Sequence, residues 1–384
     1  MTANPDPDTT WVRPNEFVVD LGAVSHNAAR LRQAVGHRFI YASLKADAYG
    51  YGLAAIADTL VASGVDGFAL VSIADAVQLR SRGHTQPILL YSGVPFTTTA
   101  VEAIEAYALT PTVSDLASAR RLAQAAKGPV RVYLEVDAGL GRLGVEVEQA
   151  PALIAGLHTL PQLQVTGLYA HMHVASGAWR PEYLAWQMMR FGQVQRLVED
   201  AGLPVEHVMV ASTGILLGTT ELGLTAVDPG RWFYGLTGAG APKGASAGLL
   251  PAFDCLRTAL TEVKSYERSE FLQDMPFAGT VPDRIGVIPV GWADGMNQLN
   301  VGEVLVHDRR VKVLGRPFIE HTRIDLSEVP EAVPGDRVIL IGGDSVVRIT
   351  PEEVADHNGV SSPCLLALSV GSAFHRVYTD RRSR

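Results

Sequence analysis

From residue 17 onward, short apolar runs rich in β-branched residues alternate with stretches whose apolar residues recur at helical spacing. This alternation is typical of parallel strands joined by crossover helices. The predicted helices include Leu53–Ser63 and Ser114–Ala126. The predicted strands are Phe39–Leu44, Gly67–Val71, Pro87–Tyr91, Leu109–Val113, Val130–Val136, Gln164–His171, His207–Ala211 and Ala226–Asp228. Eight repeats within about 230 residues favour an α/β fold with a closed (β/α)8 barrel, and an open doubly wound sheet remains the alternative.

The pattern changes after about residue 250, where strands alternate in and out without intervening helices. Glu303–Val306, Val311–Leu314 and Arg337–Ile341 are such strands, and Gly, Pro and Asp mark the turns between them. A polar N-terminal segment, residues 1–16, is therefore predicted to precede a barrel, residues 17–245, and a C-terminal mostly-β domain, residues 246–384. The stretch 237–250, rich in Gly and Ala, is interpreted as the linker.

Composition agrees with a globular chain, because 47% of the 384 residues are hydrophobic and 19% are charged. The net charge of −8, without a run of five like charges, argues against nucleic acid as a partner. Residues 1–16 lack an apolar signal core and no stretch reaches about 18 apolar residues, so we expect a cytoplasmic protein without a membrane span. Cys255 and Cys364 are far apart, which excludes a disulfide scaffold and a cysteine zinc site. We expect no metal.

In a (β/α)8 barrel the active site lies at the C-terminal ends of the strands. Lys45 ends the first predicted strand there, and the glycine-rich turn Ala46–Gly52 follows it. Partial burial would lower the pKa of such a lysine, which suits Schiff-base chemistry with an aldehyde. A solvated lysine at the rim is the simpler interpretation of the same position.

The segment Ser43–Gly52 resembles the pyridoxal-phosphate lysine motif of the alanine racemase family, whose members are fold-type III enzymes. Further similar segments follow in the family's order: Asp137–Gly144, Gly167–His171, Pro229–Gly235 and Ile288–Gly295. The resemblance covers about residues 16–380. It implies a barrel that binds pyridoxal 5'-phosphate, a β domain, and a head-to-tail homodimer with shared active sites that acts on a small amino acid.

The resemblance also implies roles for single residues. Lys45 would hold the cofactor as an internal aldimine and act as a base, and Arg142 would bind the substrate carboxylate, which suits a planar guanidinium. His171 would lie near the cofactor ring. The positions matching those that hold the phosphate are Tyr49, Ser212 and the backbone amides of Gly230 and Arg231.

Two catalytic positions depart from the family. The family's second base is a tyrosine, where this chain has Trp292, and an indole N–H cannot act as a base at neutral pH. The family's arginine at the pyridine nitrogen is replaced by Asp228, and a carboxylate there makes the ring a stronger electron sink. Asp228 is otherwise an Asx-turn residue before Pro229.

Other differences concern charge. Glu135 stands where the family often has a carbamylated lysine, and we expect it to pair with Arg142. Ser372 stands roughly where the family has a phosphate-binding tyrosine, and Arg231 is either a replacement source of positive charge for the phosphate or a solvent-facing arginine. His171 is expected to bond Asp228, and His173 is an additional acid or base candidate. Three further candidates for the missing tyrosine come from segments expected near the partner's site: Asp294, Glu320 and His321.

These observations predict a pyridoxal-phosphate enzyme, an isomerase by resemblance, that acts at Cα of a small amino acid through an external aldimine. It is predicted not to be an ordinary alanine racemase. Asp228 leaves open a decarboxylase, lyase or transaminase activity, and a noncatalytic protein that binds the cofactor is a third interpretation.

Overall fold

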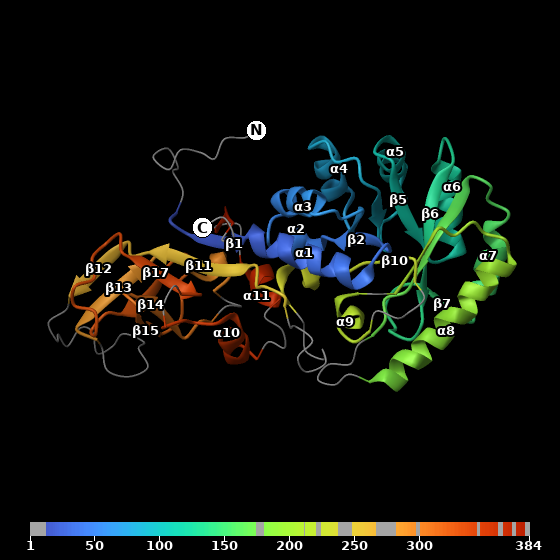
Figure 1. The fold of residues 1–384 in the computed structure, drawn as a ribbon. Coiled ribbons are helices and arrows are strands. Elements are labelled where there is room, and N and C mark those ends of the chain that lie inside the picture. The colour runs from blue at the N-terminus through green and yellow to red at the C-terminus, as the bar shows by residue number, and fades with distance from the viewer. Residues whose placement is uncertain are drawn as a thin grey trace. The chain divides into compact units, whose positions relative to one another are not determined.

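The computed structural model comprises two compact units, one formed by Leu21–Ala252 and the other by Met1–Asp20 together with Phe253–Arg384 (Figure 1). The residues it describes are 13–173, 180–210, 212–219, 224–236, 248–265, 282–296, 300–343, 346–359, 364–370 and 374–380. Within this part of the chain, no helix is long and apolar enough to cross a membrane.

The first unit is a nearly closed barrel of parallel strands, which confirms the predicted (β/α)8 fold. In spatial order the strands are β10 (Ala226–Val227), β2 (Phe39–Ser43), β3 (Gly67–Leu70), β4 (Ile88–Leu90), β5 (Leu109–Val113), β6 (Val130–Asp137), β8 (Leu163–Tyr169) and β9 (His207–Met209). Thr225 joins the two ends of this order, because it exchanges hydrogen bonds with Val208 of β9 and accepts one from the Phe39 amide of β2. A short strand, β7 (Val145–Glu146), pairs only with β6.

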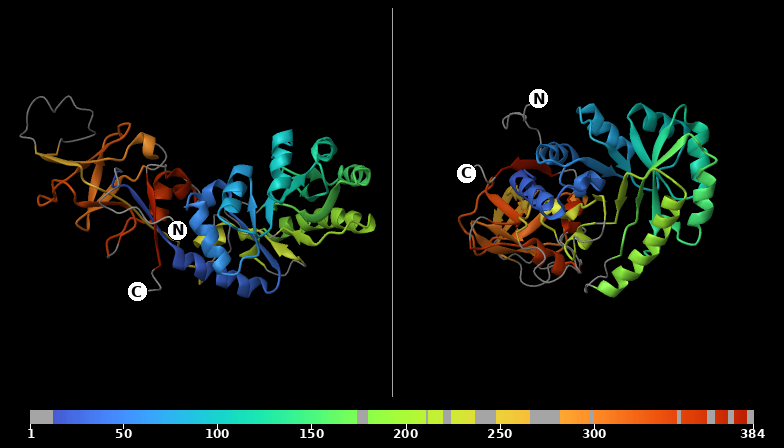
Figure 2. Two further views of the ribbon diagram at one scale, coloured as in Figure 1. Left: turned by 90° about the horizontal axis from the view of Figure 1, so that it is seen from above. Right: turned by 45° about the vertical axis from the view of Figure 1, so that its right-hand side comes forward.

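Helices cover the outside of the strands, as the right-hand view of Figure 2 shows. They are α1 (Leu21–Val35), α3 (Leu53–Ala62), α4 (Ile73–Ser81), α5 (Thr98–Ala106), α6 (Leu116–Ala125), α7 (Ala150–Leu157), α8 (Pro181–Asp200) and the short α9 (Thr213–Leu216). Helix α3 buries Leu53, Ile56, Ala57 and Leu60, the spacing of one helical face. Ser72, Thr97 and Asp115 accept amide hydrogen bonds as N-caps, which fixes where α4, α5 and α6 begin.

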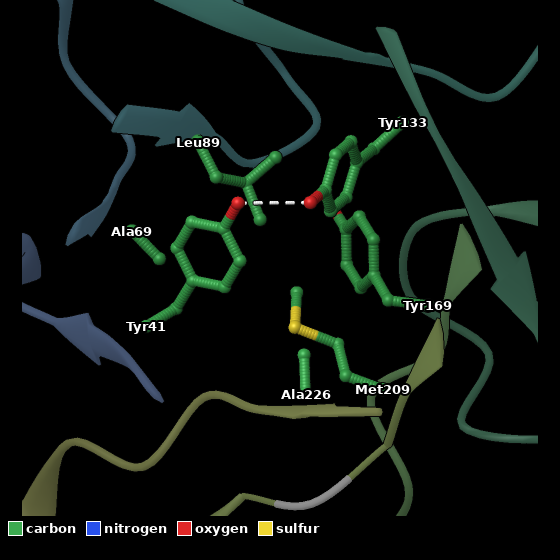
Figure 3. Close-up of a cluster of buried hydrophobic side chains, with 7 residues drawn as sticks. All are labelled: Tyr41, Ala69, Leu89, Tyr133, Tyr169, Met209 and Ala226. Carbon is green, nitrogen blue, oxygen red and sulfur yellow. Dashed lines mark hydrogen bonds between the residues drawn. The ribbon is translucent and has the colours of Figure 1, made fainter. Parts of the chain in front are cut away.

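Side chains rather than solvent fill the barrel interior (Figure 3). The buried cluster consists of Tyr41, Ala69, Leu89, Tyr133, Tyr169, Met209 and Ala226. The hydroxyls of Tyr41 and Tyr133 lie 2.9 Å apart and hydrogen-bond each other. Gly167 makes room for the Tyr133 ring, since a Cβ at position 167 would lie 2.3 Å from it. Because side chains fill the interior, the reactive groups are expected at the C-terminal ends of the strands.

The second unit is one mostly antiparallel sheet. Its strands, in spatial order, are β12 (Glu262–Ser265), β13 (Arg284–Ile288), β16 (Thr322–Asp325), β15 (Arg309–Leu314), β14 (Glu303–Val306), β17 (Arg337–Ile341), β11 (Phe253–Ala259), β1 (Glu16–Asp20) and β18 (His375–Thr379). Two short helices accompany them, α10 (Pro351–His357) and α11 (Cys364–Ser369). Cys255 is buried in β11, and the side chain of Cys364 lies outside the described part of the structure.

Strand β1 is where the structure departs from the expected boundary at residue 17. It pairs antiparallel with β11 and parallel with β18, so residues 17–20 belong to the β unit and not to the barrel. The physical reason is burial, because Phe17, Val18 and Val19 are all buried and find their partners within that sheet. The chain therefore enters the barrel only at α1.

Candidate active site

The turn after β2, labelled α2 (Lys45–Tyr49), is wound in the left-handed sense. Ala46, Asp47, Ala48 and Tyr49 have φ values of 55°, 52°, 55° and 58°. This conformation costs roughly 1–2 kcal/mol per L-residue, so the surroundings must hold it. The Asp47 carboxylate does so by accepting the Leu53 amide at 2.7 Å, and the Gly50 amide donates to the Ala46 carbonyl at 2.9 Å. The turn fixes Lys45 at the C-terminal end of β2.

Tyr49 lies between Lys45 and the segment that follows β10. The Lys45 ammonium is 5.9 Å from the centroid of the Tyr49 ring, and that ring is 5.7 Å from the ring of Tyr234. A Cβ on Gly230 would lie 2.4 Å from the Tyr49 hydroxyl. Only glycine permits this close approach, so position 230 forms a cradle against the tyrosine.

Two of the predicted phosphate positions border this cradle. Gly230 precedes η2 (Arg231–Tyr234), and its amide donates to the Thr213 hydroxyl at 3.2 Å, a contact that the sequence analysis did not anticipate. Ser212 precedes α9 and makes no capping hydrogen bond with its side chain. Thr213 therefore ties the start of η2 to the start of α9.

Asp228 follows β10 directly and is 8% exposed. Its Oδ2 accepts a hydrogen bond of 2.8 Å from the Tyr91 hydroxyl. Burial raises the pKa of Asp228 from 3.8 to about 6, while the Tyr91 hydrogen bond and the charge of Lys45 oppose the rise. Asp228 is thus a buried carboxyl group within electrostatic reach of Lys45 and mostly ionised at neutral pH.

Tyr91 is a site residue that the sequence analysis missed. It follows β4, and its ring is 5.8 Å from that of Tyr169. Burial and the neighbouring Asp228 charge raise the pKa of Tyr91 well above its ordinary value, with hydrogen bonding to Ser43 opposing them. Tyr91 is therefore a permanent hydroxyl donor. An aromatic residue ending an apolar strand is indistinguishable from core by pattern alone, and no signal in the sequence marked it.

Glu135 lies across the barrel mouth on β6, paired in register with Tyr169 of β8. It is 3% exposed and accepts a hydrogen bond of 3.1 Å from the Tyr169 hydroxyl. Burial raises the pKa of Glu135, and the charge of Arg142 lowers it. The expected direct pair is nevertheless absent from the described ion pairs, because Arg142 is exposed on the loop after β6. Tyr169 takes the place expected of the arginine.

His171 follows β8 at the same end of the barrel. Burial first, and then the charges of Arg142, Lys45 and Arg231, lower its pKa to about 4, so the imidazole is neutral at physiological pH. The structure thus brings three predicted site residues, Arg142, Lys45 and Arg231, within electrostatic reach of His171. The hydrogen bond expected from His171 to Asp228 is not found among the described residues, and Tyr91 makes that contact instead.

Helix α8 fastens two loops of this site. Gln187 is fully buried; its side chain accepts the His173 amide at 2.8 Å and donates to the His173 carbonyl at 3.0 Å. The Tyr183 hydroxyl donates to the Gly139 carbonyl at 3.0 Å. Tyr183 and Trp186 border a hollow of about 530 Å³, together with His173, Arg180 and Glu182. The loop of Arg142 and the end of β8 are thereby held by one helix.

The remaining candidates belong to the β unit. Trp292 begins a short 3-10 helix, η4 (Trp292–Asp294), and its side chain is 59% exposed. Asp294 is buried, pairs with Arg13 at 3.1 Å and accepts the Gly291 amide. Glu320 pairs with the same Arg13 at 2.8 Å, so both carboxylates stabilise local structure.

Two further candidates complete this set. His321 is exposed, and its carbonyl accepts the Phe318 amide. Ser372 lies outside the described residues.

Comparison with known proteins agrees with this architecture. The sequence model of the alanine racemase N-terminal domain family matches residues 19–238, and the model of the C-terminal domain family matches residues 256–378. Alanine racemase 2 of Caldanaerobacter subterraneus subsp. tengcongensis is 30% identical over 352 residues, covering 90% of this chain and 89% of the relative. Alanine racemase of Syntrophobacter fumaroxidans is 32% identical over 364 residues, covering 92% and 93%.

Solved structures give the same result. Alanine racemase from Streptomyces coelicolor A3(2) superposes with a TM-score of 0.80 at 27% identity, covering 96% of this chain and 98% of that one. The enzyme from Bacillus anthracis with bound L-Ala-P superposes with a TM-score of 0.86 at 22% identity, covering 97% of both chains, which shows a shared fold. Since both domain models match in order along nearly the whole length, the chain belongs to the alanine racemase family.

Proposed function

We propose that this protein is a pyridoxal-phosphate enzyme that acts at Cα of a small amino acid and is not an ordinary alanine racemase. Family membership supports the first half of the proposal. One observation carries the second half. The buried carboxyl of Asp228 lies within electrostatic reach of Lys45 and is bonded by Tyr91, at the position where the family resemblance implies an arginine.

The donor set suits the cofactor. Lys45 supplies an amine for the aldehyde of the cofactor. Because Gly230 has no Cβ, its backbone can lie close to the Tyr49 hydroxyl, as a phosphate site built from both groups requires. The hydroxyl of Ser212 and the cation of Arg231 are of the kinds that bind phosphate. Asp228 is a buried carboxyl group that would face the pyridine nitrogen. Bound there, pyridoxal phosphate would act as an electron sink that makes the Cα proton acidic.

The chain's own residues then divide the work. Lys45 takes and returns the Cα proton, and Arg142 binds the substrate carboxylate in bidentate fashion. His171 stays neutral, so it adds no positive charge beside these two cations. Glu135 supplies a negative charge that acts on Arg142 without a direct pair. A single base on one face allows exchange of the Cα proton but not efficient inversion.

Trp292 is the reason that inversion is impaired. In the head-to-tail homodimer that we propose, this position comes to the partner's site in place of the family's tyrosine base. The indole N–H can donate a hydrogen bond but cannot take a proton at neutral pH. The proposed enzyme therefore lacks the second proton acceptor of a two-base racemase.

Asp228 favours a second candidate function. A carboxylate at the pyridine nitrogen stabilises negative charge developing at Cα more strongly, which suits loss of carbon dioxide or a side-chain fragment, or transamination. A decarboxylase, lyase or transaminase is therefore the alternative. A noncatalytic protein that binds the cofactor is the third.

Product analysis tests the proposal. The purified protein is reconstituted with pyridoxal phosphate, incubated with L- and D-amino acids, and the products are identified by mass. We expect processing of a small amino acid that Lys45→Ala abolishes, with little inversion of alanine. Fast inversion of alanine in both directions would contradict the proposal, and so would activity that survives Lys45→Ala.

A further inference from the structure

We infer that Tyr91 is a positioning residue that keeps Asp228 ionised and correctly oriented in the proposed cofactor site. The inference rests on the proposed function, because it assigns a task to the residue expected at the pyridine nitrogen. It concerns a tyrosine that is neither part of the motifs described above nor assigned a role by the proposed mechanism.

The geometry joins three strand ends of the barrel. Tyr91 follows β4, Asp228 follows β10, and Ser43 ends β2. The Tyr91 hydroxyl donates to Oδ2 of Asp228 at 2.8 Å, which fixes the rotation of the carboxyl group. The amide of Ser43 donates to the Pro229 carbonyl at 3.0 Å, so the residue after Asp228 is also anchored to β2. The carboxyl group is thus held by Tyr91 from the end of β4, and the backbone that follows it is held by Ser43 of β2.

The direction of the hydrogen bond decides its effect. The Tyr91 hydroxyl stays protonated at every physiological pH, so toward Asp228 it acts as a donor. A donor stabilises the charged carboxylate more than the neutral acid. The other charged groups acting on Asp228 are Lys45, which favours its ionised form, and Glu135, which disfavours it. Removing the hydroxyl takes away the hydrogen bond that stabilises the ionised carboxylate, and so favours protonation of Asp228.

A protonated Asp228 would be a poorer partner for a pyridine nitrogen that must carry a proton. Tyr91 would therefore control the charge of the cofactor ring without touching substrate. Substitution Tyr91→Phe is the test, because it removes the hydroxyl and keeps the ring that packs 5.8 Å from Tyr169.

The experiment follows the absorbance of the reconstituted holoenzyme between pH 5 and 9 in wild type, Tyr91→Phe, Asp228→Asn and the double variant. We expect Tyr91→Phe to lower, by about one to two pH units, the pH at which the ring nitrogen of the bound cofactor loses its proton, because a more easily protonated Asp228 stabilises that proton less. In the Asp228→Asn background the same change should produce no further shift. An unchanged midpoint in Tyr91→Phe, or an equal shift without the carboxyl group, would overturn the inference.

A measurement without cofactor separates this inference from the proposed function. The infrared band of a protonated carboxylic acid, assigned by subtraction of Asp228→Asn, reports the protonation of Asp228 in the apoprotein. We expect the band to persist to higher pH in Tyr91→Phe than in wild type. If this shift appears but the wild type does not bind pyridoxal phosphate, the proposed function fails and the link between Tyr91 and Asp228 stands; if the band is unmoved, the inference fails. If Tyr91→Phe does not fold, Ser43→Ala replaces it, because the Ser43 side chain is hydrogen-bonded to Tyr91. The infrared band should then persist to a slightly higher pH than in wild type. An unchanged band would overturn the inference.

Discussion

Asp228 and Glu135 are buried carboxyl groups at the same end of the barrel, and each takes its hydrogen bond from a tyrosine on another strand. Tyr91 donates to Asp228, and Tyr169 donates to Glu135. Burial raises the pKa of both acids, and the tyrosine hydrogen bonds oppose that effect. Two carboxylates can therefore persist in a poorly solvated site because each has its own donor.

The raised pKa of Asp228 predicts how folding stability depends on pH. The folded-state value is about 6 against an ordinary 3.8, so the neutral acid is favoured by folding. The raised pKa of Asp228 adds about 3 kcal/mol to the free energy of unfolding. This contribution is complete below about pH 4 and is lost as the pH rises through about 6. Denaturant unfolding at pH 4 and pH 8 should show that Asp228→Asn stabilises the apoprotein more at pH 8 than at pH 4.

The control is Asp58→Asn, which changes an exposed carboxylate paired with Arg82 at 2.7 Å. It should show no comparable gain at pH 8. If Asp228→Asn and wild type lose stability in parallel between the two pH values, Asp228 does not have a raised pKa.

Gly230 permits a second prediction at this scale. Gly230→Ala would place a Cβ 2.4 Å from the Tyr49 hydroxyl and should cost about 1–3 kcal/mol of folding stability. Gly128→Ala is the matched control, since a Cβ there meets nothing within 4 Å. Thermal unfolding of both variants decides the point. Equal melting temperatures would show that the cradle between Gly230 and Tyr49 is not tight.

At the scale of elements, hydrophobic periodicity predicted the barrel strands to within two residues at each end. That accuracy has a physical reason, because strands buried on both faces appear as continuous apolar runs bounded by turn residues. The left-handed turn after Lys45 could not be predicted in this way, since Ala46, Asp47 and Ala48 have no intrinsic preference for positive φ. Tertiary contacts impose that conformation.

The same limit explains the site residues that sequence reasoning missed. Tyr91 directly follows β4 and Tyr169 ends β8, positions where aromatic residues normally pack in the core. Their hydroxyl groups become functional only because the barrel brings Asp228 and Glu135 opposite them. Lys45, Asp228 and Gly230 were identifiable because their motifs carry the family resemblance, whereas contacts between distant strands are not encoded in any local motif.

Helix α8 supports a prediction about one buried glutamine. Gln187→Leu would leave the amide and carbonyl of His173 without their side-chain partner, at a cost of roughly 1–3 kcal/mol. We expect faster hydrogen exchange at the end of β8 and weaker binding of a carboxylate inhibitor. Gln193→Leu, an exposed position on the same helix, is the control and should leave both unchanged. If hydrogen exchange after β8 is as slow in Gln187→Leu as in wild type, Gln187 does not hold this segment in place.

For the whole molecule, the N-terminal strand is the informative element. Strand β1 lies between β11 and β18, so the β unit is assembled from both ends of the sequence while the barrel is one continuous segment. Neighbours in space that lie far apart in the chain leave no periodic signal near residue 17, which is why the boundary expected there was misplaced. The sheet of the β unit is therefore complete only when strands from both ends of the chain have paired.

This arrangement predicts where a destabilising change spreads. Phe17 is fully buried, and Phe17→Ala should cost about 3–5 kcal/mol. Hydrogen exchange should accelerate in β11 and β18, which pair with β1, and remain unchanged in β3, β4 and β5 of the barrel. Faster exchange in the barrel strands with protection retained in β11 would contradict the assignment of β1.

The central claim is that Lys45 exchanges the Cα proton without the second base of an ordinary alanine racemase. The most direct test is incubation of the reconstituted protein with L- and D-amino acids in D2O, read by chiral mass spectrometry. We predict deuterium at Cα of one enantiomer without inversion, or loss of a fragment from the substrate, and neither in Lys45→Ala. Rapid appearance of both enantiomers of alanine carrying deuterium would contradict the claim, because it would require a second base in spite of Trp292.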